Sequence, residues 1–170
     1  MVQKVVGLMP VIGVSGQKVA TDSARYLAYN PLSDGTVISG GFAFAKTAGG
    51  TQGAPFAIVS GTGSAGDVPL GFVERVLDET LLVVTASGTT TLREGAVVTV
   101  AVQGQFYLEV PAGLSSITAG MGVYINPTTG AINLASSAGS GEEDTGFKVV
   151  IPNGGASADA GDIVIIEKFN

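Results

Sequence analysis

From about residue 36 onward, the chain is a succession of short runs of β-branched and aromatic residues, each closed by Gly, Ser, Asn or Asp. No stretch repeats its apolar residues at the period of an amphipathic helix. Short apolar runs with frequent turn residues are typical of antiparallel sandwiches and barrels. The sequence therefore predicts an all-β fold, a single jelly-roll-like β-sandwich or small barrel, with strands over residues 36–45, 56–60, 70–76, 81–86, 96–102, 105–110, 123–126, 131–134, 147–151 and 163–168.

Local patterns predict several turns. Residues 98–102 alternate, residues 103–104 are Gln-Gly, and an apolar run resumes at 106–110, which predicts a β-hairpin. Residues 126–130 have Pro in second place and Gly last, which indicates a tight turn. A glycine also precedes three strand-like runs at unequal spacing, which favours similar turns within one domain over a fixed repeat: Gly95, Gly120 and Gly161.

The first 32 residues differ in character from the rest, because apolar patches alternate with Gly, Ser and Gln. We expect residues 1–32 to form an N-terminal arm and residues 33–170 to form the β domain. A fully extended segment of thirty residues spans about 100 Å. The alternative, that this segment adds one or two ordinary strands to the core, stays equally open. The residues that we expect in an interface are Val5, Leu8, Met9, Ile12, Tyr26 and Tyr29.

The chain carries few charges: 45% of its residues are hydrophobic and only 13% are charged. A surface so poor in charge is expected to be covered by copies of the chain or by a partner. The net charge of −6 and the scattered basic residues argue against nucleic-acid binding. No apolar stretch approaches the ~18 residues of a membrane helix, so we expect no membrane partner.

Catalytic chemistry has little support. The chain has no His and no Cys, which removes the usual general base, the thiolate nucleophile and Cys-ligated zinc. The carboxylates lack the spacing of a calcium loop, and we expect no catalytic residue, no metal and no cofactor. Residues 61–66 match G-x-G-x-x-G, but Pro69 and Gly71 prevent the helix that a dinucleotide site requires, so the match is attributed to chance.

Short motifs of Gly and Val recur over about the last hundred residues, at Pro69 to Val73, Glu94 to Val100, Gly104, Tyr107 to Val110, Ile117 to Ile125, Thr129 to Ile132 and Gly161 to Ile166. In order and spacing this succession resembles the phage structural cement (head decoration) protein family. The chain departs from the pattern at Met121, where an Asp is typical, and its arm aligns with nothing in the family.

The resemblance implies a compact jelly-roll-like β domain whose N-terminal arm lies on neighbouring subunits. It implies a non-enzymatic decoration protein that binds the outer surface of the expanded phage head and stabilises the shell. The expected partner is the major capsid protein, together with other copies of the chain as a dimer or trimer. The expected location is the outside of the capsid in the virion, after synthesis in the host cytoplasm.

Two other classes remain open. A receptor-binding or fibre module of a phage virion is also all-β and oligomeric, and it would bind cells or glycans in isolation. A small β-fold hydrolase would need carboxylates brought together by the fold, and the candidates are Glu74, Asp78, Glu142 and Asp144.

Overall fold

The computed structural model describes residues 14–19, 23–29, 31–46, 58–75, 82–84, 90–152 and 155–169, except for the side chains of 82–84. None of these residues forms an α-helix, and so no described helix is long and apolar enough to cross a membrane. The described strands are β1 (Arg25–Tyr26), β2 (Leu32–Ser33), β3 (Phe42–Ala45), β4 (Ile58–Ser60), β5 (Gly71–Val73), β6 (Leu82–Val84), β7 (Thr90–Leu92), β8 (Val100–Glu109), β9 (Gly122–Ile125), β10 (Ile132–Ala135), β11 (Glu143–Val150) and β12 (Ile163–Lys168).

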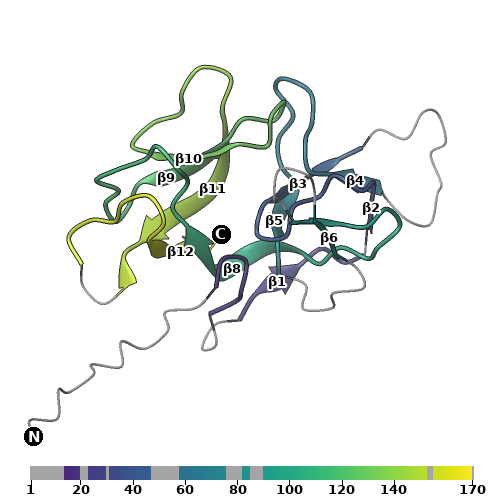
Figure 1. Ribbon diagram of the computed structural model, residues 1–170, viewed down its shortest axis with the longest axis horizontal. Helices are drawn as coiled ribbons and strands as arrows, with labels where there is room; N and C mark the ends of the chain where they lie inside the picture. Colours follow the sequence, from purple (N-terminus) through teal and green to yellow (C-terminus); the bar gives the residue numbers. More distant parts are fainter. Residues whose placement is uncertain are drawn as a thin grey trace, which may run out of the picture.

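The long strand β8 joins two halves of one sheet. The strand order is β10-β9-β11-β12-β8-β5-β3-β4-β2, β1 pairs separately with β8, and β6 pairs with β7. Figure 1 shows β9 to β12 on one side of β8 and β2 to β5 on the other. The pairs are antiparallel except β2 with β4, which is parallel. The predicted all-β class is confirmed.

The N-terminal half closes on itself in the manner of a small barrel. Strand β2 lies beside β4 and also beside the residues that lead into β8, where Leu32 is opposite Val97. The Ser33 amide donates to the Ala96 carbonyl at 2.8 Å, and the Val98 amide donates to the Pro31 carbonyl at 2.8 Å. These bonds use the outer edge of β2, which would otherwise be an unpaired sheet edge.

Two hydrophobic cores lie on opposite faces of the central strands. In β3, Phe42 and Phe44 point into one core and Ala43 points into the other. We name the first the aromatic core; it fills the space between the two halves and includes Phe42, Phe44, Phe72, Ala101, Phe106, Leu108, Val123, Ile125, Phe147, Val149, Val164 and Ile166. We name the second the valine core; it fills the inside of the barrel-like half with Val37, Ala43, Val59, Val73, Leu92, Ala96, Val98 and Val100.

The predicted hairpin at residues 98–110 is wrong, because both of its arms belong to the single strand β8. Gly104, where the turn was expected, has a φ of +129° inside the strand. The neighbouring pair β1 with β8 shifts register near this point, so Gly104 marks an irregularity in a continuous strand. A Gln-Gly pair between two alternating runs does not by itself distinguish a turn from such a bulge.

The other turn predictions are confirmed. The Gly130 amide donates to the Asn126 carbonyl at 2.8 Å, and the Asn126 side-chain oxygen accepts the Thr128 amide at 3.0 Å. Three further glycines precede paired segments and have positive φ with open space around them: Gly95, Gly120 and Gly161. A positive φ favours glycine at these turns.

Phe72 is one of two rings of the aromatic core, with Phe147, that each contact three other rings. Its centroid lies 5.4 Å from that of Phe42, 5.1 Å from that of Phe106 and 6.2 Å from that of Phe147. Phe72→Ala is expected to lower the free energy of unfolding by about 3–5 kcal/mol, since it leaves a cavity between the halves. Urea denaturation measures this change.

The matched control is Phe169→Ala, because the Phe169 side chain is 53% exposed. Its expected cost is below about 0.5 kcal/mol. Equal losses in the two variants would contradict the account of the aromatic core.

Candidate interaction surface

Several acidic residues of the described chain accept hydrogen bonds that hold turns and loops. Glu142 accepts the Asn133 side-chain amide at 3.0 Å and the Gly139 backbone amide at 2.7 Å. The Ser116 amide donates to Asp159 at 2.8 Å, and the Asp159 amide donates to Asp162 at 2.8 Å. Among the described residues, no group of three or more acidic side chains is placed to hold a metal. Asp78 and Glu79 lie outside the described residues.

A polar cleft of about 440 Å³ lies beside the G-x-G-x-x-G segment. Residues 61–70 form a loop between β4 and β5, and no helix follows it. The geometry of a dinucleotide site is therefore missing from this segment. The cleft is lined by residues at the ends of β3 and β4 and in the loops after β2, β3 and β4, including Asp34, Thr36, Lys46, Ser60, Thr62 and Asp67.

Asp34 organises the wall of this cleft. Its carboxylate accepts the Thr36 hydroxyl at 2.6 Å and the Lys46 ammonium at 2.9 Å. Burial alone would raise the pKa of Asp34, but the hydrogen bonds from Thr36 and Lys46 outweigh burial and lower this pKa below its ordinary value. Because the carboxylate is already bonded to Thr36 and Lys46, we interpret Asp34 and Lys46 as a structural ion pair.

Tyr26 lies in β1, on one edge of β8, and its hydroxyl donates to the Glu74 carboxylate. Burial, this hydrogen bond and the negative charge of Glu74 raise the pKa of the Tyr26 phenol above its ordinary value. Part of the ring stays exposed to solvent. Glu74, which was considered as a catalytic carboxylate, is therefore a partner of the Tyr26 phenol.

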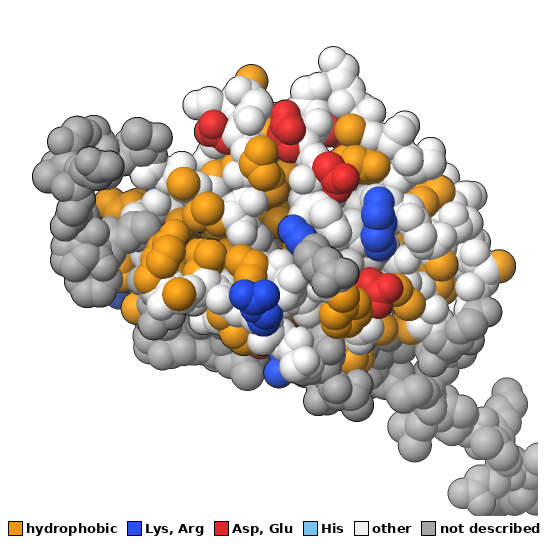
Figure 2. Space-filling model, turned by 180° about the vertical axis from the view of Figure 1, so that it is seen from behind, with side chains coloured by type: hydrophobic (Ala, Val, Ile, Leu, Met, Phe, Trp, Pro, Cys, Tyr) orange, Lys and Arg blue, Asp and Glu red, His pale blue; other side chains and the backbone are white. Residues whose placement is uncertain are grey.

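An exposed apolar surface covers the outer side of the barrel-like half. We name it the apolar flank and define it as Leu32, Ile58 and Val97, together with the exposed Tyr29, which precedes Leu32 by three residues. Leu32 is the register partner of both Ile58 and Val97, so the three side chains are neighbours on one face. Ile58 is 38% exposed, Tyr29 46% and Val97 49%. Figure 2 shows hydrophobic side chains gathered on the side of the N-terminal half, while charged side chains stand apart from one another.

The structure tests the position of only some predicted interface residues. Tyr26 and Tyr29 are exposed, as an interface requires. Val5, Leu8, Met9 and Ile12 lie outside the described residues. The sequence analysis missed the other residues of the flank, although Val97 stands between the buried Ala96 and Val98, as alternation along a strand demands.

Comparison with known proteins agrees with this architecture. A chain in the solved structure "The capsid of Myoviridae Phage XM1" superposes with a TM-score of 0.60 over 91% of this chain and 89% of that one, at 12% identity. At that identity the likeness shows a shared fold. Residues 2–168 match the family model of the structural cement protein (E217 gp24/Pam3 gp6). The chain belongs to the phage structural cement protein family. No curated protein matches it.

Membership confirms the resemblance seen in the Gly and Val motifs, and it makes the chain a structural component of a phage capsid. A cement protein acts through its surfaces, by association with capsid proteins. The apolar flank places the apolar side chains of Leu32, Ile58 and Val97 next to one another, and a patch of this kind is typical of surfaces that associate with other proteins.

The pair of Tyr26 and Glu74 predicts an alkaline dependence of stability. Since the folded state raises the pKa of Tyr26, the unfolded state releases the proton first, and stability should fall as pH rises above about 10. Glu74→Gln should lower the pKa of Tyr26 and so reduce the total loss of stability at alkaline pH, although burial of Tyr26 still raises this pKa. Phenolate absorbance during an alkaline titration measures the pKa, and subtraction of the Tyr26→Phe curve isolates Tyr26. Superimposable wild-type and Glu74→Gln curves would contradict the pairing.

Proposed function

We propose that the chain is a head decoration protein, which binds the outer surface of the expanded phage capsid and stabilises the shell. The observation that carries this proposal is the family match over residues 2–168. The shared fold with a chain of a myovirus capsid supports it. The protein is made in the host cytoplasm and resides on the outside of the head, with the major capsid protein as its partner.

The role is thermodynamic and needs no catalytic step. A protein that binds only the expanded shell stabilises it by RT ln(1 + [L]/Kd) per site, about 4 kcal/mol at a thousandfold excess over Kd. The net charge of −6 suits an outer position, because an acidic protein on the inside would face packaged DNA of the same sign.

Two separate contacts would join each copy to the head. The apolar flank docks on the shell, and the segment before residue 14 reaches a neighbouring subunit through Val5, Leu8, Met9 and Ile12. Two linked contacts bind far more tightly than either alone, because the second forms within the complex. Copies arranged as a dimer or trimer on a local symmetry axis would connect several capsid subunits.

The proposal is tested by co-sedimentation of the purified protein with expanded, undecorated heads and with unexpanded heads. Saturable binding to the expanded form only is the expected result. Absence of binding to both forms would overturn the proposal and favour the receptor-binding or fibre module, which a glycan and cell-binding screen then tests.

The flank makes a specific prediction in this assay. Val97→Lys is expected to weaken binding to expanded heads at least about tenfold, since it places a charge in an apolar contact. Val68→Lys is the matched control, because Val68 is 67% exposed in the loop before β5 and lies outside the flank. Thermal unfolding of the free variants should match that of the wild type. Equal binding by the two variants would exclude the flank from the contact.

The N-terminal contact makes a second prediction. Removal of residues 2–13 is expected to weaken binding to heads at least about tenfold while the free domain unfolds at the same temperature. The truncation stops at residue 13, because Gly16, Val19 and Leu27 bond to β8 and Ser33 bonds to the segment before it. The matched control is the full-length chain with Val5, Leu8, Met9 and Ile12 replaced by Ser, which should behave like the truncated chain. Full binding by both variants would refute the N-terminal contact.

A further inference from the structure

The first described residues lie along one edge of β8. The Gly16 amide donates to the Tyr107 carbonyl at 2.8 Å, and the Tyr107 amide donates to the Gln17 carbonyl at 2.9 Å. The Val19 amide donates to the Gln105 carbonyl at 3.0 Å. Residues 14–19 therefore form a ladder with the second half of β8.

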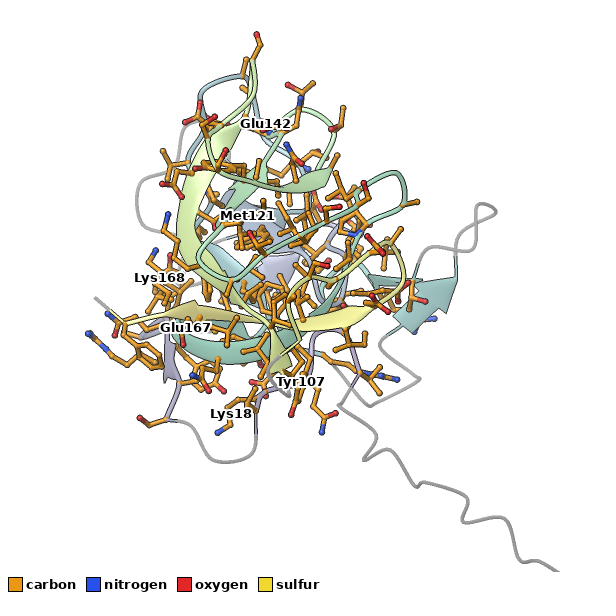
Figure 3. All side chains as sticks on the ribbon, turned by 90° about the vertical axis from the view of Figure 1, so that its left-hand side faces the viewer. Lys18, Tyr107, Met121, Glu142, Glu167 and Lys168 are labelled. Atoms are coloured by element: carbon orange, nitrogen blue, oxygen red, sulfur yellow. The ribbon has the colours of Figure 1, made fainter. Side chains whose placement is uncertain are left out.

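This ladder is on the β5 edge of β8. The Arg75 amide, just after β5, donates to the Gly16 carbonyl at 2.8 Å, and so residues 14–19 continue the line of β5. Strand β12 pairs with the same part of β8, from Gly104 to Glu109, and occupies the opposite edge. Figure 3 shows Lys18 near Tyr107, with Glu167 and Lys168 of β12 away from them.

The next described residues lie along the other edge. Tyr26 is the register partner of Ala101, and the Leu27 amide donates to the Val100 carbonyl at 3.0 Å. Strand β5 also pairs with Ala101 and Val100. A strand has two edges, so β1 must lie opposite β5, on the edge that β12 uses farther along. Residues 14–19 therefore lie on one edge of β8 and residues 25–27 on the other.

The crossing point is Gly104. A Cβ added to Gly104 would lie 2.9 Å from the Ala24 Cβ and 3.0 Å from its Cα, so Ala24 occupies the place of a side chain. The φ of +129° at Gly104 also disfavours any L-residue there. Gly104 thus allows the N-terminal segment to cross the central strand in contact with its backbone.

We propose that the described residues 14–19 and 23–27 form a clasp around β8, which fixes the N-terminal segment to the strand that both cores share. A segment bonded to both edges and crossing between them cannot detach by the opening of one edge alone. A force that pulls on the chain before residue 14 would therefore be shared by the hydrogen bonds that join the clasp to β8. The use of this device on the shell rests on the proposed function, but the clasp itself is a property of the free protein.

Hydrogen exchange of the free wild-type chain tests the clasp directly. The Val19 and Leu27 amides lie on opposite edges of β8, and both should exchange within about tenfold of the Val110 amide, which bonds to Asp162 beside the core. Exchange of Val19 and Leu27 more than about a hundredfold faster than Val110 would mean that the segment frays independently, and it would overturn the proposal.

A matched pair of glycine variants tests the crossing. Gly104→Ala and Gly113→Ala both place a side chain at positive φ, but only Gly104 meets a neighbour, since nothing lies within 4 Å of a Cβ at Gly113. Gly104→Ala should accelerate exchange of Val19 and Leu27 at least tenfold more than Gly113→Ala does. Equal acceleration would overturn the role of Gly104, and the wild-type exchange test decides the clasp if Gly104→Ala does not fold.

Shell binding separates this proposal from the proposed function. If the clasp anchors the segment before residue 14, heads decorated with Gly104→Ala should release the protein at a lower temperature than heads decorated with Gly113→Ala. Identical release temperatures would contradict its use on the shell. Failure of the wild type to bind any head would instead remove the proposed function and leave the exchange result standing.

Discussion

The structure depends on the packing of β8 between two cores. Val100 belongs to the valine core and its neighbour Ala101 to the aromatic core, so consecutive side chains are buried on opposite faces. Both edges of the strand are also hydrogen-bonded, to β5 and β12 and to the N-terminal segment. A substitution in β8 therefore affects the packing of both halves. The exposed surfaces of the two halves keep their relative positions only while this strand is in place.

The sequence predicted best those strands that alternate between core and solvent. The range 163–168 was predicted as the structure has it, because Val164 and Ile166 are buried while their neighbours are partly exposed. The range 36–45 was too long: β3 begins at Phe42, although Ile38 forms one isolated bridge. Strands buried on both faces lose alternation, so their ends are not visible in the pattern. The bulge at Gly104 was mistaken for a turn because the residues around it do not show whether the strand continues past the glycine or reverses direction.

The candidate interaction surface was only partly predictable. Tyr26 and Tyr29 were predicted to lie in an interface because aromatic residues are frequent anchors there, and the structure places both at the surface. The rest of the flank combines Ile58 and Val97, which are far apart in the sequence and are connected only through Leu32. That connection includes the single parallel strand pair among the described strands, which no local signal predicts. The Gly and Val motifs, in contrast, were sufficient to identify the family.

The physical account assigns the chain a stabilising role that multiplies over many copies on one head. Its central claim is that binding lowers the free energy of the expanded shell. The most direct measurement is the melting temperature of expanded, undecorated heads at increasing concentrations of the protein. The account predicts a rise that continues until the sites saturate. A melting temperature that stays constant while the protein is bound would contradict it, because ligands that bind only the intact shell must stabilise it.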